Sequence, residues 1–136
     1  MAKRDTKSTV EVDVDAKAGD SGAKRGVLTV LGGIRTGAVI DISGEPLVVG
    51  RTDEADVTID DHSLSRRHAR FTALRGHYYV ADLDSTNGTF VNGERIAKTV
   101  ELNDGVRVQL GEATLLRFSL QDDAEYAASS RLYEAT

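Results

Sequence analysis

Short apolar runs separated by glycine-containing turns dominate the middle of the chain. Hydrophobic residues there alternate with polar ones, as Ala69, Phe71 and Ala73 do, and a period of two is typical of half-buried strands. Asn92-Gly93 between two such runs predicts a type I′ hairpin, because both residues tolerate positive φ. About ten strands are predicted, at residues 27–31, 38–42, 47–49, 57–59, 68–74, 78–83, 89–91, 94–96, 106–110 and 116–120. With no convincing helix between them, an all-β sandwich of two antiparallel sheets is the economical architecture.

The two ends of the chain carry different patterns. Residues 1–26 are rich in Lys, Asp, Ala, Gly and Ser and contain no aromatic residue, which predicts a disordered N-terminal tail. Valines alternate with acidic residues at positions 10–15, so an added edge strand is the alternative there. Residues 121–136 contain good helix formers behind an acidic start and predict a helical extension or linker. The sandwich is therefore expected to span residues 27–120.

Composition and charge exclude several classes of function. The 136 residues suit one domain, and 22 acidic residues against 17 basic ones leave a formal charge of -5, which disfavours nucleic acid as a partner. The absence of cysteine removes thiolate metal sites and cysteine nucleophiles and suits a reducing compartment. No apolar run approaches the roughly 20 residues of a membrane span, and the N-terminus does not resemble a signal peptide. We therefore expect a cytoplasmic protein with no membrane partner.

Three predicted loops hold most of the polar chemistry. They are Gly50-Arg51 after a strand, the segment HSLSRRH at 62–68, and DSTNG at 84–88. Loops after alternate strands of a sandwich collect at the same end, so the three can converge. Their side chains are hydrogen-bond donors, and the charged ones are positive; they belong to Arg51, Ser65, Arg66, Thr86 and Asn87. Such a site is suited to an anion with several acceptor oxygens, and phosphate fits that description.

Each of these residues also has a simpler interpretation. Arg51 alone could form a surface ion pair with Asp53, Glu54 or Asp56, and Ser65 could close a turn with Asp61. Only the ordered set of loop residues favours a binding site over these local contacts.

Catalytic and metal-binding arrangements are not supported by the residue spacing. A hydrolase triad could be drawn from Ser63, Ser65, His68 and Asp82, but there is no GxSxG nucleophile elbow. The three histidines lack metal-ligand spacing, and no dinucleotide fingerprint or Walker loop is present. We expect neither an enzyme nor a cofactor.

The three loops together resemble the signature of the forkhead-associated (FHA) domain. The matching blocks are GR at 50–51, SRRH at 65–68 and STNGTFVNG at 85–93. The resemblance covers about residues 27–120 and implies an eleven-stranded sandwich that binds phosphothreonine peptides. A partner protein carrying phosphothreonine, and a Ser/Thr kinase pathway that produces it, are the implied context.

The resemblance also implies a role for each motif residue. Arg51 and Arg66 would hold the phosphate oxygens, Ser65 and Thr86 would add hydroxyl donors, and Asn87 would bond the peptide main chain. His68 would brace the loop that carries the serine. Gly50 would let the backbone turn so that Arg51 enters the site. Structural support would also come from Gly88, Asn92 and Gly93.

Two function classes stay open at this point. One is a phosphothreonine-dependent binding module; the other is a phosphate-independent interaction or self-association domain that regulates an attached effector. Thr9 and Thr6 in the tail are possible phosphorylation sites, and phosphorylated Thr9 could occupy the domain's own site. The C-terminal extension resembles the linker of bacterial signalling proteins that end in a GGDEF diguanylate cyclase domain, whose catalytic motif this chain lacks.

Overall fold

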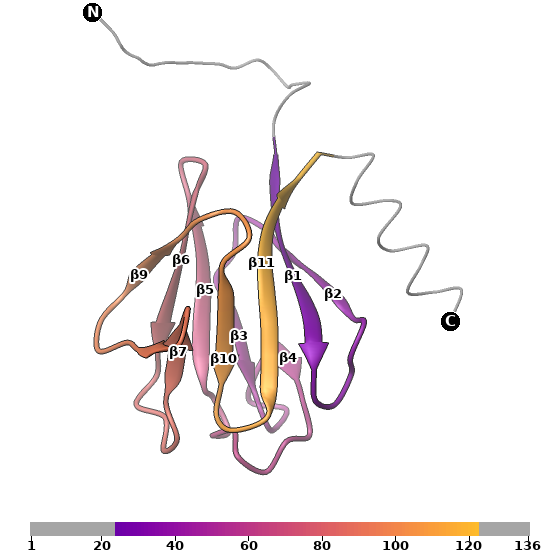
Figure 1. Cartoon of the computed structure of the whole chain (residues 1–136), viewed down its shortest axis with the longest axis vertical. Helices are drawn as coiled ribbons and strands as arrows, with labels where there is room; N and C mark the ends of the chain where they lie inside the picture. Colours follow the sequence, from indigo (N-terminus) through magenta and orange to yellow (C-terminus); the bar gives the residue numbers. More distant parts are fainter. Residues whose placement is uncertain (1–23, 123–136) are drawn as a thin grey trace, which may run out of the picture.

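Eleven strands in two layers make up the part of the chain that can be described. The computed structural model describes residues 24–122, and Figure 1 shows the two sheets packed face to face. The strands are β1 (Arg25–Gly32), β2 (Val39–Ile42), β3 (Leu47–Gly50), β4 (Val57–Thr58), β5 (Ala69–Leu74), β6 (His77–Asp82), β7 (Thr89–Val91), β8 (Glu94–Arg95), β9 (Val100–Leu102), β10 (Arg107–Leu110) and β11 (Thr114–Gln121). The predicted all-β sandwich is confirmed.

The strands pair almost entirely with antiparallel neighbours. One sheet has the order β2-β1-β11-β10-β7-β8 and the other β4-β3-β5-β6-β9. The exception is the parallel pair β3 and β4, so the smaller of the two sheets predicted to be antiparallel contains one parallel pair. After Gly50 the chain returns alongside β3, and two hydrogen bonds join Asp56 to Val48 near the start of that strand. Asp56 N–H donates to the Val48 carbonyl oxygen, and Val48 N–H donates to Asp56 Oδ2, both at 2.8 Å.

Alternation along the strands fills the space between the sheets. Phe71 of β5 and Phe118 of β11 are fully buried, and the ring of Tyr78 lies 5.3 Å from that of Phe118.

Asn92 and Gly93 have φ values of 50° and 87°, as the predicted hairpin between β7 and β8 requires.

Most strands lie within one residue of their predicted bounds, and the larger differences concern β1, β9 and β11. β1 begins at Arg25 and β11 ends at Gln121, because these residues pair with each other across the two strands. β9 was missed, because a three-residue strand gives too short an alternation to stand out, and within residues 24–122 it pairs only with β6. The predicted tail before residue 24 and the predicted helix beyond residue 122 lie outside the described residues.

The loops after β3, before β5 and after β6 meet at one end of the sandwich, the lower end in Figure 1. The β5–β6 hairpin lies at the opposite end.

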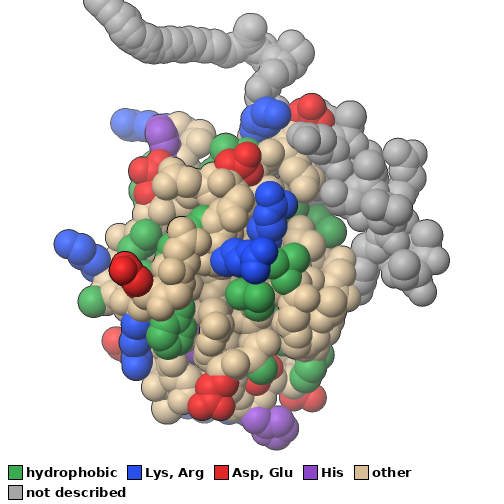
Figure 2. All heavy atoms as spheres, viewed as in Figure 1, with side chains coloured by type: hydrophobic (Ala, Val, Ile, Leu, Met, Phe, Trp, Pro, Cys, Tyr) green, Lys and Arg blue, Asp and Glu red, His purple; other side chains and the backbone are tan. Residues whose placement is uncertain are grey.

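Figure 2 shows basic side chains gathered on the outer face of the larger sheet, where Arg107 of β10 and Arg117 of β11 are exposed and directly opposite each other. Within residues 24–122 no helix is long and apolar enough to cross a membrane.

Candidate functional site

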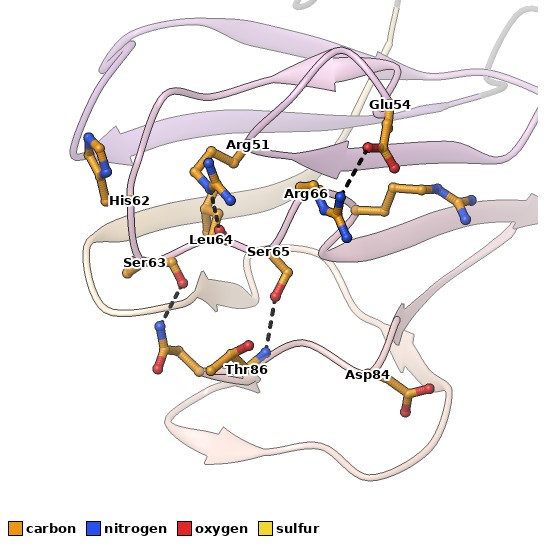
Figure 3. A pocket seen from close by; sticks show the side chains of 11 residues that line it. Arg51, Glu54, His62, Ser63, Leu64, Ser65, Arg66, Asp84 and Thr86 are labelled. Carbon is orange, nitrogen blue, oxygen red and sulfur yellow. Dashed lines mark hydrogen bonds and ion pairs between the residues drawn. The ribbon is translucent and has the colours of Figure 1, made fainter.

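The meeting loops enclose an open pocket of about 500 Å³. Figure 3 shows its side chains converging from the β3–β4, β4–β5 and β6–β7 connections. The five residues predicted to bind ligand all line this pocket, together with six others. The complete lining is Arg51, Glu54, His62, Ser63, Leu64, Ser65, Arg66, Arg67, Asp84, Thr86 and Asn87. The lining contains three arginines and two carboxylates, so the pocket favours anions although the whole chain is acidic.

Arg51 is fixed by the loop opposite it. Its Nε donates to the Leu64 carbonyl oxygen at 3.0 Å, and its backbone N–H donates to the Ser65 carbonyl oxygen at 3.0 Å. Using Nε in this way leaves the two terminal nitrogens of the guanidinium to donate to a ligand. An ion pair of Arg51 with a neighbouring carboxylate, the simpler interpretation, is not formed in the described structure: Asp56 bonds Val48 and Glu54 faces Arg66.

Gly50 has a different role from the one expected. Its φ is not among the positive values, so the turn itself does not need glycine. A Cβ at this position would instead overlap the Arg66 carbonyl oxygen and lie 2.7 Å from the Arg66 carbonyl carbon. Glycine is required because the two backbones pass in contact, and this contact sets Arg51 beside the loop that carries Ser65.

Ser65 joins two of the loops. Thr86 N–H donates to Ser65 Oγ at 3.0 Å, so the serine hydroxyl acts as an acceptor there and keeps its own O–H to donate to a ligand. The dashed line between them in Figure 3 joins the β4–β5 connection to the β6–β7 connection. The exposed side chain of Thr86 lines the same pocket.

Asn87 also bridges loops. Its Nδ2 donates to the Ser63 carbonyl oxygen at 2.8 Å. One amide hydrogen and Oδ1 then stay available for a peptide main chain, which has both a donor and an acceptor to match.

His68 braces the site from beneath, as the family resemblance implied. Ser65 N–H donates to its Nδ1 at 3.1 Å, and its Nε2 lies 2.8 Å from the Gly88 carbonyl oxygen. Because a carbonyl can only accept, the neutral ring carries its proton on Nε2. With both nitrogens occupied and the ring fully buried, His68 cannot serve as the base of a hydrolase triad.

Two carboxylates, the buried Asp61 and the half-buried Asp82, accept hydrogen bonds from the binding loops, and sequence reasoning missed this role. Asp61 accepts hydrogen bonds from Ser63 N–H, Ser63 Oγ and Thr114 Oγ1. Thus Ser63, and not Ser65, closes the turn with Asp61. Asp82 likewise accepts from Ser85 N–H, Ser85 Oγ and Thr89 Oγ1. Each aspartate is followed two or three residues later by the serine that donates to it, Ser63 after Asp61 and Ser85 after Asp82. This short Asp–Ser spacing is the one signal in the sequence that could have predicted these hydrogen bonds.

The backbone that follows Asn87 is shaped by Gly88, Asn92 and Gly93. Gly88 has a φ of 94°, its N–H bonds Ser85 Oγ, and its carbonyl accepts from His68 and from Gly111 N–H. Asn92 Oδ1 accepts from Arg107 N–H at 3.2 Å, tying the β7–β8 hairpin to β10. Gly93 serves the turn alone, because no atom of the described residues lies within 4 Å of a Cβ placed there.

Burial and hydrogen bonding shift three ionisable groups beneath the pocket. Burial lowers the pKa of His68 below 6.5, against the opposing effects of the Gly88 carbonyl and the two aspartates. Burial raises the pKa of Asp61, but the hydrogen bonds from Thr114 and Ser63 outweigh it and leave a pKa below 3.8. The pKa of Asp82 is lowered in the same way, by Ser85 and Thr89 against burial. All three groups therefore take up a proton more readily in the unfolded chain.

Stability is expected to fall in two stages on acidification. A depressed pKa contributes stability that is complete above the unfolded value and is lost as the pH falls, so His68 acts first, below about pH 6.5, and the aspartates act below about pH 4. Urea unfolding at a series of pH values measures both stages. In His68→Gln the first stage should vanish while the second persists. A wild-type free energy of unfolding that stays constant down to about pH 5 would contradict the assignment to His68.

Comparison with known proteins agrees with this geometry. The family model described as FHA domain matches residues 47–111. The glycogen accumulation regulator GarA of Mycolicibacterium smegmatis is 36% identical over 115 residues, which cover 78% of this chain and 72% of GarA. The chain belongs to the FHA domain family.

Further FHA proteins show the same similarity. FhaB of Mycobacterium tuberculosis is 35% identical over 88 residues, which cover 65% of this chain and 57% of FhaB. The chain thus matches somewhat more than half the length of that relative. The solved MEK1 FHA domain in complex with the HOP1 pThr318 peptide has a TM-score of 0.62 and 27% identity, covering 71% of this chain and 97% of that one.

Proposed function

We propose that this FHA domain is a signalling module that binds phosphothreonine-containing segments of partner proteins in the pocket formed by Arg51, Ser65, Arg66, Thr86 and Asn87. The observation that carries the proposal is the position of Arg51, whose guanidinium is held at Nε by Leu64 and directs its other donors into the pocket. The solved MEK1 relative, which was determined with a phosphothreonine peptide, supports it.

The chemistry of the pocket matches a phosphoryl group. Phosphothreonine carries close to two negative charges near pH 7 and offers three acceptor oxygens. Arg51 and Arg66 supply charge-assisted donors, each hydrogen bond being worth about 1.5–3 kcal/mol. Ser65 supplies a hydroxyl whose oxygen is already oriented by Thr86. Binding of a ligand, without chemical conversion of it, is the role that this set of donors supports, and GarA is likewise named as a regulator.

The experiment that tests the function is a calorimetric titration with a phosphothreonine peptide selected from a degenerate library and with its unphosphorylated twin. We expect the phosphate to increase affinity by about 100-fold or more, since it makes at least two charge-assisted contacts. Equal affinities for the two peptides would favour the other function class, a phosphate-independent interaction domain. The face that carries Arg107 and Arg117 would then be the first surface to test.

The source of the phosphothreonine follows from the same proposal. A Ser/Thr kinase must supply it, either on another protein or on Thr9 or Thr6 of this chain, both of which lie outside the described residues. A tethered ligand would gain from its high effective concentration. Phosphorylating Thr9 should therefore shift the resonances of Arg51 and Ser65, and no shift would exclude phosphorylated Thr9 as the ligand; the same test applies to Thr6. The cytoplasmic location and the attachment to a GGDEF domain stay predictions.

A further inference from the structure

The pocket contains negative as well as positive charge. Glu54, in the connection after β3, and Asp84, in the connection after β6, both line it beside the three arginines. A phosphopeptide that enters brings close to two further negative charges. Glu54 is the carboxylate that already has a partner in the site, because Figure 3 shows it facing Arg66, with Arg66 Nη1 3.8 Å from Glu54 Oε2.

The Arg66–Glu54 ion pair is weak enough to be exchanged. The two side chains are 69% and 51% exposed, and exposed pairs of this kind contribute little to stability. A phosphate group can accept two hydrogen bonds from one guanidinium and carries more charge than a carboxylate. Arg66 should therefore leave Glu54 when phosphate enters, whereas Arg51, held at Nε by the Leu64 carbonyl, already faces the pocket.

Exchange leaves Glu54 without its partner and close to the bound phosphate. A like charge at this position opposes binding, and a basic side chain from the peptide removes the conflict by replacing Arg66 beside the carboxylate. An acidic side chain at the same peptide position increases the repulsion. Glu54 thus favours peptides with a basic side chain at this position over peptides with an acidic one, because it attracts the positive charge and repels the negative charge.

We propose that Glu54 is a specificity-determining residue that selects phosphothreonine peptides with a basic side chain next to the phosphoresidue. The inference rests on the proposed function, because it takes the phosphate as the ligand that draws Arg66 away. It assigns Glu54 a role in binding that the FHA motif blocks of this chain do not include.

The test uses phosphothreonine peptides that differ only by Lys, Gln or Glu at each flanking position in turn, titrated against the wild-type chain and Glu54→Gln. At one position the wild type should bind the Lys peptide about five-fold more tightly than the Glu peptide, and in Glu54→Gln this ratio should fall to about two or less. Glu54→Gln should also bind the Gln peptide more tightly than the wild type does, since the competing carboxylate is gone.

Glu45→Gln is the matched control. Glu45 is exposed, lies in the turn before β3, at the far end of that strand from Gly50, and is not part of the pocket. It should keep the wild-type preference. The same preference in Glu54→Gln as in the wild type would overturn the inference and leave the proposed function intact. Failure of the wild type to distinguish phosphorylated from unphosphorylated peptides would overturn both.

Discussion

Replacement of Arg51 with alanine is expected to weaken binding of the selected phosphothreonine peptide by about 100-fold or more, because the phosphate loses at least two charge-assisted hydrogen bonds. Binding of the unphosphorylated peptide should hardly change. The affinity of Arg51→Lys for the phosphorylated peptide should lie between those of the wild type and Arg51→Ala. A lysine ammonium group cannot donate to Leu64 and present a planar pair of donors at the same time. Isothermal calorimetry at constant ionic strength measures all three.

The control for this prediction removes the same charge elsewhere. Arg75 is exposed in the turn between β5 and β6, at the end of the sandwich opposite the pocket. Arg75→Ala should keep the wild-type affinity. If Arg51→Ala and Arg75→Ala lost affinity equally, the attraction would come from the overall charge and not from the pocket.

Gly50→Ala is expected to reduce the free energy of unfolding by about 3 kcal/mol, which is the upper end of the usual cost of overpacking. The added Cβ meets backbone atoms of Arg66, and backbone cannot move aside as a flexible side chain can. Hydrogen bonds between Val49 and His68 and between Arg51 and Ser65 hold the two segments together on either side of the contact. Any relief of the overlap must therefore displace Ser65 and Arg66.

Gly44→Ala provides the comparison for Gly50→Ala. Gly44 has an ordinary φ, and in the part of the chain that the structure describes nothing lies within 4 Å of a Cβ placed there. Urea unfolding should show Gly44→Ala within about 0.5 kcal/mol of the wild type. Peptide affinity should fall only in Gly50→Ala, measured below its unfolding transition. Equal free energies of unfolding for the two variants would contradict the close contact between Gly50 and the Arg66 backbone.

The sequence was sufficient for the part of the site that the ligand would touch. Arg51, Ser65 and Asn87 stand in short motifs at the ends of predicted strands, and loops at one end of a sandwich converge. The fold brings their side chains into one pocket as expected. Their roles toward a ligand are part of the proposed function.

The supporting contacts could not be obtained from the sequence in the same way. Asp61 bonds Thr114 across 53 residues of chain, and this pairing depends on how the two sheets face each other. The reason for Gly50 was misread because a close approach of two backbones leaves no local signal, unlike the positive φ that a turn demands. β9 was missed for a related reason, since its place is set by pairing with β6 and its own three residues carry little pattern.

The most direct measurement of where the ligand binds is a chemical-shift titration of the isotopically labelled chain with the phosphothreonine peptide. The largest changes should fall on the backbone amides of Arg51, Ser65, Arg66 and Asn87 and on the Arg51 side-chain Nε–H. The unphosphorylated peptide should leave these signals in place. Changes that cluster instead around Arg107 and Arg117, with the pocket signals unmoved, would contradict phosphate recognition by the three loops.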